Sequence, residues 1–98
     1  MAIMEINIIP LGTKTPSVSK YLAEPLKLLK KEGVKFELTS MSTIIEGDID
    51  TLFELARKMH FSAFTLGVER IVTTIKIDDR RDKPSTIEGK IEKLREKI

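Results

Sequence analysis

The chain has 98 residues, of which 41% are hydrophobic and 33% charged, a content that fits one globular domain and leaves no room for two independent cores. Lysines and arginines number 17 against 15 acids, and both signs are spread along the chain, so no basic block marks a nucleic-acid or membrane surface. There is no cysteine and only one histidine, which excludes disulfides and cysteine-ligated zinc and leaves little for metal chemistry. The first residues contain no basic leader before an unbroken apolar run, so we expect a cytoplasmic protein.

The first two predicted elements are a strand and a helix. Apolar and polar side chains alternate over residues 3–9, which is typical of a strand. Pro10 and Gly12 end this strand. The following helix can begin at a cap by Thr15 or Ser17, since serine and threonine accept hydrogen bonds from free backbone N–H groups.

The predicted helix ends at Gly33, a residue that favours the left-handed turn after a helix. Pro25 lies well inside it and should produce a kink. Residues 34–39 alternate again and predict the second strand. A short turn then leads into the third strand at residues 43–47.

The second half predicts another helix and a fourth strand. Asp48 can cap a helix running from about Ile49 to Leu66, which Gly67 ends. We expect its buried stripe to consist of Ile49, Leu52, Phe53, Ala56, Met59 and Ala63. Residues 70–78 alternate and predict the fourth strand.

A charged segment, DDRRDKP at residues 78–84, precedes a last helix. Ser85 and Glu88 are spaced as a capping box for that helix. Its apolar residues form one seam, Ile87, Ile91, Leu94 and Ile98. Because the charges of the segment nearly cancel, we interpret it as a salt-bridged loop that positions the last helix and touches a neighbouring subunit.

This order of elements predicts the α+β class: a ferredoxin-like βαββαβ sandwich with an extra C-terminal helix, forming one domain over residues 1–98. We expect strands one and three to lie parallel in the middle of the sheet, with both long helices on one face. The opposite face would show Glu5, Asn7, Ile9, Glu37, Thr39, Val72, Thr74 and Lys76. That mixture suits burial against another copy of the chain, and a solvated face is the alternative.

No enzyme signature is present. The serines lie in no GxSxG elbow, and the chain has neither a P-loop nor a GxGxxG motif. His60 lies on a predicted helix and is interpreted as a surface or half-buried residue. RNA binding is disfavoured because the predicted open face carries no aromatic side chain on which a base could stack. We expect no catalytic residue, no metal and no cofactor.

The predicted parallel pairing groups polar residues at the two ends of the sheet. At one end it would bring together Gly12, Thr13, Ser17, Ser19, Glu46, Gly47 and Arg70. At the other, the hydroxyls of residues 39–43 would share a rim with the exit of the fourth strand at residues 78–81. Either rim could hold a small polar molecule between subunits, and the structural alternative is that these groups only satisfy the backbone in turns and caps.

Four motifs in order, PLGT, SVSxY, ELTxMxTxIEG and TTIKIDDRRDK, make the chain similar to the thiamine-binding protein family, a YkoF-like group of ferredoxin-like proteins. The similarity spans nearly the entire sequence. It implies a homo-oligomer, a tetramer of paired dimers, that binds thiamine or its hydroxymethylpyrimidine part without transforming it. Two alternatives stay open: a structural oligomer whose site is vestigial, and an enzyme of thiamine-precursor metabolism.

The resemblance also implies a set of ligand-binding residues: Gly12, Ser17, Ser19, Thr39, Ser40, Met41, Thr43, Glu46 and Thr74. A carboxylate such as Glu46 could balance the thiazolium cation, and hydroxyls could pair with the aminopyrimidine. The sulfur of Met41 could lie against an aromatic ring. The chain departs from the family pattern at Pro25 and at Ser42, where glycine is more familiar.

Overall fold

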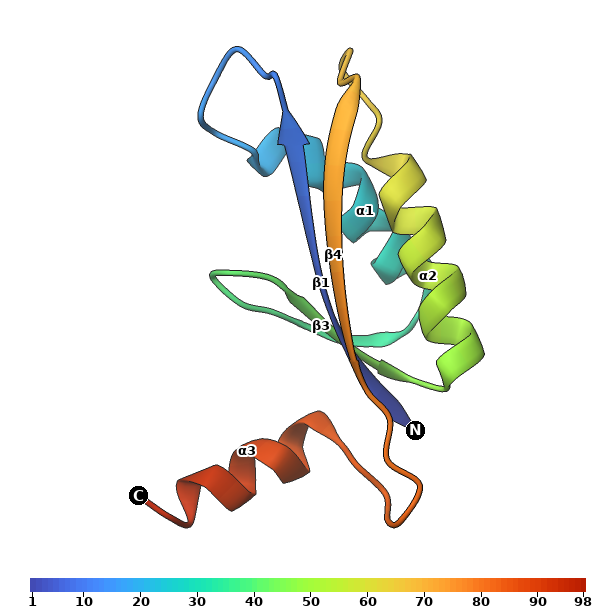
Figure 1. Cartoon of the computed structure of the whole chain (residues 1–98), viewed down its shortest axis with the longest axis vertical. Helices are drawn as coiled ribbons and strands as arrows, with labels where there is room; N and C mark the ends of the chain where they lie inside the picture. The colour runs from blue at the N-terminus through green and yellow to red at the C-terminus, as the bar shows by residue number, and fades with distance from the viewer.

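The computed structural model describes all 98 residues as seven elements (Figure 1). They are β1 (Ala2–Leu11), α1 (Ser19–Glu32), β2 (Lys35–Leu38), β3 (Thr43–Gly47), α2 (Ile49–Ser62), β4 (Arg70–Asp78) and α3 (Ile87–Arg95). This order confirms the α+β class and the expected βαββαβ succession with an added helix. No helix is both long and apolar enough to span a bilayer.

The sheet has the order β2-β3-β1-β4, and every neighbouring pair is antiparallel. The prediction that strands one and three run parallel is therefore wrong. Each helical crossover skips one position in the sheet, so it makes β1 parallel to β2 and β3 parallel to β4, and the β2–β3 hairpin sets the two pairs in opposite directions. The two groups of polar residues that were predicted at the ends of the sheet therefore have partly different members in the structure.

The two central strands differ in length. β1 pairs with β4 from Ile3 to Leu11 but with β3 only from Ala2 to Ile6. Figure 1 shows β1 and β4 running on together as a long ribbon beyond β3. Past Ile6, the edge of β1 that faces away from β4 has no strand beside it.

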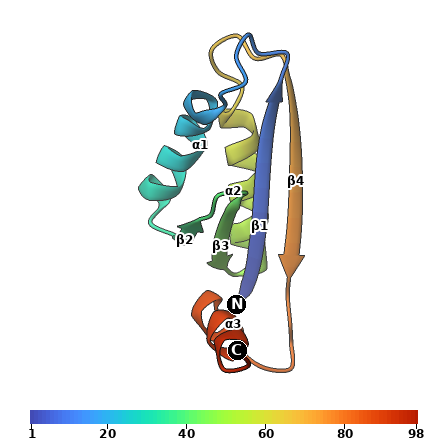
Figure 2. The ribbon, with the colours of Figure 1, turned by 90° about the vertical axis from the view of Figure 1, so that its left-hand side faces the viewer.

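The core lies between the sheet and the two long helices, which cover one face (Figure 2). It consists of Ala2, Met4, Ile6, Ile8, Leu29, Ile45, Leu52, Leu55, Ala56, Met59 and Ala63. The expected burial of Phe53 is wrong, since this side chain is 57% exposed. Leu52 and Leu55 are three residues apart and share the inner face of α2, whereas Phe53 is turned about 100° round the helix from Leu52.

The ends of α1 agree in part with the predicted caps. Gly33 adopts the expected left-handed conformation, with φ of 69°. At the other end the N-cap is Val18, without a side-chain hydrogen bond. The hydroxyl of Thr15 instead accepts a hydrogen bond from the N–H of Ser17 at 3.2 Å, in the loop before the helix. Pro25 is buried inside α1.

The start of α2 is capped as predicted, but the helix is shorter than expected. The carboxylate of Asp48 accepts hydrogen bonds from the N–H and the hydroxyl of Thr51, both at 2.9 Å, and these bonds lower the pKa of Asp48. The helix ends at Ser62. Leu66 and Gly67 have φ of 54° and 79°, so the chain has already left the helical conformation there.

The last helix begins one residue later than the predicted capping box. The hydroxyl of Thr86, not that of Ser85, accepts from the N–H of Gly89 at 2.9 Å. A Cβ on Gly89 would lie only 2.9 Å from that hydroxyl, so glycine keeps the cap in place. Of the predicted seam only Ile87 is buried, and the rest of the seam, Ile91, Leu94 and Ile98, is exposed.

The charged segment is indeed a salt-bridged loop. Arg80 holds Asp82 through two hydrogen bonds of 2.8 and 2.5 Å. Asp78, at the end of β4, pairs with Lys90 of α3. The segment thus carries the chain from β4 to α3, which lies beyond the end of the sheet near the amino terminus (Figures 1 and 2).

Candidate functional site

Four of the predicted binding residues come together at the β2–β3 turn. Thr39, Ser40, Met41 and Thr43 line a cavity of about 290 Å³, which we call the hairpin cavity. Its other walls come from β1, from α1 and its N-cap, from two residues beside the turn and from one core residue of α2: Ile6, Asn7, Ile8, Ile9, Val18, Leu22, Pro25, Leu26, Leu38, Ser42 and Met59. The two positions that depart from the family pattern, Pro25 and Ser42, therefore both lie at this cavity.

The hairpin cavity exists because β3 is short. β3 begins at Thr43, opposite Ile6, so the edge of β1 from Asn7 onward is bare. The first half of α1 and the turn at residues 39–42 close the space beside that edge. A bare strand edge offers backbone donors and acceptors in alternation, which a flat polar ligand can pair with.

The turn itself is held by Thr39. Its hydroxyl accepts from the N–H groups of Met41 and Ser42, at 3.1 and 2.9 Å, and its own N–H donates to the carbonyl of Ser42 at 2.9 Å. The hydroxyls of Ser40 and Thr43 make no hydrogen bond within the protein, although both line the cavity. The turn thus has a fixed backbone and two hydroxyls available to a ligand.

A second hollow of about 250 Å³ lies on the open face of the sheet, on the other side of the same turn. This open-face hollow is lined by Glu5, Asn7, Met41, Ser42, Thr74 and Lys76. The carboxylate of Glu5 accepts a hydrogen bond from the hydroxyl of Ser42 at 2.9 Å. Asn7, Met41 and Ser42 border both spaces, so one ligand could contact both.

Sequence reasoning did not place Glu5 among the binding residues. Glu5 lies opposite Lys76 and Ile44, and Asn7 opposite Thr74, in the register of the sheet. The alternation of residues 3–9 already placed Glu5 on the open face. Only the hairpin turn, which sets Ser42 against Glu5, shows that this carboxylate is the one near the predicted hydroxyls.

Glu46 lies at the other end of the sheet, opposite Ile3. Its carboxylate accepts from the backbone N–H of Ile87 at 2.9 Å, and Lys35 lies 3.5 Å away. Lys35 also contacts Glu88 of α3 at 2.6 Å. This bond to Glu88 raises the pKa of Lys35 and lowers that of Glu88. Glu46 is thus part of the attachment of α3.

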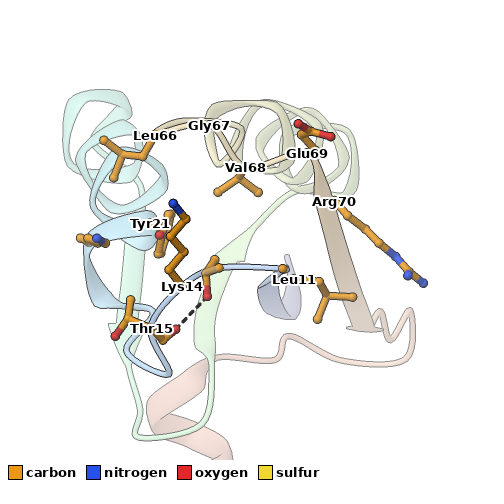
Figure 3. Close-up of a pocket in the computed structure, with 12 residues that line it drawn as sticks. Leu11, Lys14, Thr15, Tyr21, Leu66, Gly67, Val68, Glu69 and Arg70 are labelled. Atoms are coloured by element: carbon orange, nitrogen blue, oxygen red, sulfur yellow. Dashed lines mark hydrogen bonds between the residues drawn. The ribbon is translucent and has the colours of Figure 1, made fainter.

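Gly12 borders a third space, the loop hollow, of about 750 Å³ (Figure 3). Two loops, 11–15 and 66–70, form most of its wall, together with Lys20 and Tyr21. Figure 3 shows Tyr21 and Lys14 near its middle, whereas Arg70 turns away from them. Most of its lining residues are exposed, so a ligand there would keep much of its water.

Ser17 and Ser19 border none of these three spaces. They lie at the start of α1, with their hydroxyls 3.5 Å apart. The predicted proximity of Gly12 to Arg70 is confirmed, because Arg70 pairs with Leu11. The predicted proximity of Gly12 to Glu46 is wrong, because Glu46 lies opposite Ile3.

His60 is half-buried on α2, as predicted, with its Nδ1 2.6 Å from the hydroxyl of Thr73. It borders neither the hairpin cavity nor the open-face hollow. The hairpin cavity is lined by no histidine, cysteine or carboxylate. The lining is mostly apolar with a few hydroxyls, which is a common composition of small-molecule pockets.

Comparison with known proteins shows the family of the chain. The sequence profile of the family described as thiamine-binding protein matches residues 4–95. The chain belongs to the thiamine-binding protein family. It is 48% identical over 98 residues to the UPF0045 protein YqgV of Bacillus subtilis, covering 96% of this chain and 94% of that protein.

Solved structures of the family share the fold. The hypothetical protein MJ1052 of Methanocaldococcus jannaschii superposes with a TM-score of 0.87 at 39% identity, over 97% of this chain and 96% of that chain. A Thermotoga maritima protein with a provisional assignment to thiamine biosynthesis or salvage superposes with a TM-score of 0.79 at 18% identity, over 95% and 97%. At that identity the second likeness supports the fold alone.

Proposed function

We propose that the protein binds thiamine, or the aminopyrimidine part of thiamine, at the β2–β3 turn and does not transform it. One observation carries the proposal: an apolar cavity, two free hydroxyls and a carboxylate lie around one fixed turn. The chain that shows this arrangement is a member of the thiamine-binding protein family. The sequence resemblance had suggested these hydroxyls. The carboxylate is assigned here to Glu5.

The pyrimidine ring fits the hairpin cavity. Leu22 and Leu26 offer apolar contact to the faces of a ring, and the Met41 sulfur can lie against it. The free hydroxyls of Ser40 and Thr43 can each donate or accept, as the ring nitrogens and the exocyclic amine require. The bare edge of β1 adds backbone groups of fixed direction.

The thiazolium cation belongs in the open-face hollow. Glu5 is held by the hydroxyl of Ser42 and can balance a positive charge beside the turn. Lys76 lies opposite Glu5 on β4, so we place the cation on the Ser42 side of the carboxylate. Met41 and Thr74 complete this proposed contact set.

We also propose that the protein works as a homo-oligomer, a tetramer of the kind that the family resemblance implies. The open face exposes Ile9 and Val72 beside polar groups, and the seam of α3 exposes Leu94 at 68%. Such apolar surface gains free energy when a second copy covers it. Gly12, Ser17, Ser19 and Glu46 reach neither proposed ligand space within one chain, so a role for them in binding would require a neighbouring subunit.

The proposed role is non-enzymatic and cytoplasmic. General acid–base catalysis needs a titratable group within hydrogen-bond reach of the reacting atom. The residues that line the hairpin cavity supply none, and in the open-face hollow we propose that Glu5 only balances the charge of the thiazolium ring. A chain with no cysteine needs no oxidising compartment to fold. Incubation with thiamine followed by product analysis should return the ligand unchanged.

Isothermal titration with thiamine, thiamine monophosphate and hydroxymethylpyrimidine tests the binding proposal. We expect saturable heat, weakened about three- to tenfold by Ser40→Ala or Thr43→Val, since a neutral hydrogen bond is worth about 0.5–1.5 kcal/mol. Thr65→Val removes a hydroxyl that lines neither the hairpin cavity nor the open-face hollow, so it is the matched control and should leave the affinity unchanged. No heat with any of the three compounds, or loss of binding in the control alone, would overturn the proposal.

A further inference from the structure

A second cluster of polar side chains lies where the charged segment meets α3. Its members line a pocket of about 130 Å³ that contains no large apolar side chain. This basic pocket is formed by Arg80, Lys83, Pro84, Ser85, Thr86, Gly89, Lys90 and Lys93. It is remote from the hairpin cavity, because the segment follows Asp78, opposite Ile3, whereas the cavity lies beside β1 from Ile6 to Ile9.

The cations of the basic pocket outnumber the acids that neutralise them. Arg80 is held by Asp82 and Lys90 by Asp78. The other two, Lys83 and Lys93, have no carboxylate within 4.0 Å. Four cations less two carboxylates leave a local charge of +2, which equals the charge that one dianion would neutralise.

The two lysines without a carboxylate partner line the same small pocket. Lys83 comes from the loop and Lys93 from α3. The proximity of Lys93, and then of Arg80, lowers the pKa of Lys83. An anion placed between the two ammonium groups would replace repulsion by attraction.

The pocket also contains a hydroxyl without a partner. Ser85 is only 6% exposed, it lines the pocket, and its hydroxyl makes no hydrogen bond in the protein. By contrast, the N–H groups of Ile87 and Gly89 at the start of α3 are already bonded to Glu46 and Thr86. The side-chain donors left for a ligand are two ammonium groups and one hydroxyl.

We propose that the basic pocket is a binding site for a dianionic phosphate group, held by Lys83 and Lys93 with the hydroxyl of Ser85 as a further donor. A tetrahedral oxyanion presents several acceptor oxygens, which match three convergent donors. The phosphate can be free or part of a phosphate monoester. The site would function whether or not the hairpin cavity binds thiamine.

Titration with inorganic phosphate at low ionic strength, in a buffer without other multivalent anions, tests this site. We expect saturable binding below about 10 mM, weakened about tenfold or more by Lys83→Gln or Lys93→Gln, because hydrogen bonds to charged groups are the stronger kind. Ser85→Ala should weaken it about threefold. Lys97→Gln removes an exposed lysine of the same terminal segment outside the pocket, and should change the affinity less than about twofold.

A second readout separates a built site from general attraction to a basic surface. The ¹³Cε shift of Lys83, followed against pH, should give a pKa that rises when phosphate is added, because the anion offsets the charge of Lys93. Equal losses in Lys97→Gln and Lys83→Gln, or no saturable binding by the wild-type protein, would overturn the proposal. Glucose 6-phosphate binding as tightly as inorganic phosphate would identify the monoester class as a ligand source, and exclusion of the ester would identify free phosphate.

Discussion

Glu46 and Ile87 are 41 positions apart in the sequence, yet the Glu46 carboxylate accepts the backbone N–H of Ile87 at 2.9 Å. This bond joins the open face of β3 to the first turn of α3. Lys35 reinforces it by contacting both Glu46 and Glu88. Apart from Ile87, the apolar seam of α3 is exposed, so these polar contacts are a large part of what holds the helix.

Replacing Glu46 by alanine should release α3. The change leaves the Ile87 N–H without its partner, and the free energy of unfolding should fall by about 1–3 kcal/mol. Urea denaturation measures the loss, and hydrogen exchange should show reduced protection at residues 87–95. Glu37→Ala, on the same face but without such a bond, is the control. Unchanged exchange in α3 would contradict this account, and thiamine affinity should stay within about twofold because the change lies far from the turn.

Replacing Glu5 by glutamine should weaken the binding of thiamine but not the binding of its pyrimidine part alone. The variant keeps the shape of the side chain and removes its charge, so binding of cationic thiamine should weaken about tenfold, or about 1.4 kcal/mol. Binding of neutral hydroxymethylpyrimidine should hardly change. Calorimetry on both ligands, with Glu37→Gln as the control, measures the difference. Equal weakening of both ligands would mean that Glu5 acts on the turn through Ser42 and not on the cation.

Adjacent residues on α2 should respond very differently to truncation. Leu52 is fully buried, so Leu52→Ala should lower the free energy of unfolding by about 2–5 kcal/mol. Phe53 is 57% exposed, and Phe53→Ala should cost less than about 1 kcal/mol. Chemical denaturation of the two variants is the measurement. The sequence prediction of a buried Phe53 requires the opposite, a cost of about 3–5 kcal/mol at that position.

The ion pair of Arg80 and Asp82 should stabilise the fold, and this stabilisation should disappear at acid pH. The hydrogen bonds from Arg80 lower the pKa of Asp82 from 3.8 to about 2 in the folded chain. Between these values the unfolded chain binds more protons than the folded one, so the contribution is complete above about pH 4 and is lost as the pH falls through 2. Asp82→Asn should lower the melting temperature at neutral pH and make little difference below pH 2. A constant difference over that range would contradict the ionic origin.

A charge on the open face should disrupt the proposed oligomer. Val72 is 42% exposed there, and Val72→Lys would place an ammonium group in the surface that we expect a second copy to cover. Light scattering after gel filtration should show a fall in mass relative to the wild type. Lys31→Glu, on the outer side of α1, should leave the mass unchanged. A wild-type protein that is monomeric at micromolar concentration would contradict the proposed assembly.

The local pattern of the sequence predicts the elements well. The alternation of residues 3–9 gives β1 and its buried face, and Gly33 and Asp48 mark helix ends where the structure has them. The local pattern wrongly predicted that Phe53 is buried. Either of two adjacent apolar residues of a helix can be placed on its inner face until packing against the sheet fixes the rotation of the helix about its axis. The local pattern also missed the early end of α2, where Leu66 takes a left-handed conformation that its residue type does not favour.

The sequence predicted which kinds of residue form the candidate site better than it predicted which residues lie next to one another there. The hydroxyls of the 39–43 turn were found, and the structure brings four of the nine predicted residues together there. Which carboxylate accompanies them depends on strand direction. With β1 and β3 antiparallel, Glu46 lies at the α3 end and Glu5 lies near the turn, and no local pattern carries that information.

The chain has one tyrosine and no tryptophan, and Tyr21 is buried at the wall of the loop hollow. Its near-ultraviolet emission therefore comes from a single ring, with the Lys20 ammonium 5.2 Å from its centre. A compound that enters the loop hollow should quench or shift that emission, whereas one bound under the hairpin should give heat with little optical change. The native protein thus carries its own fluorescent label for deciding between the two spaces.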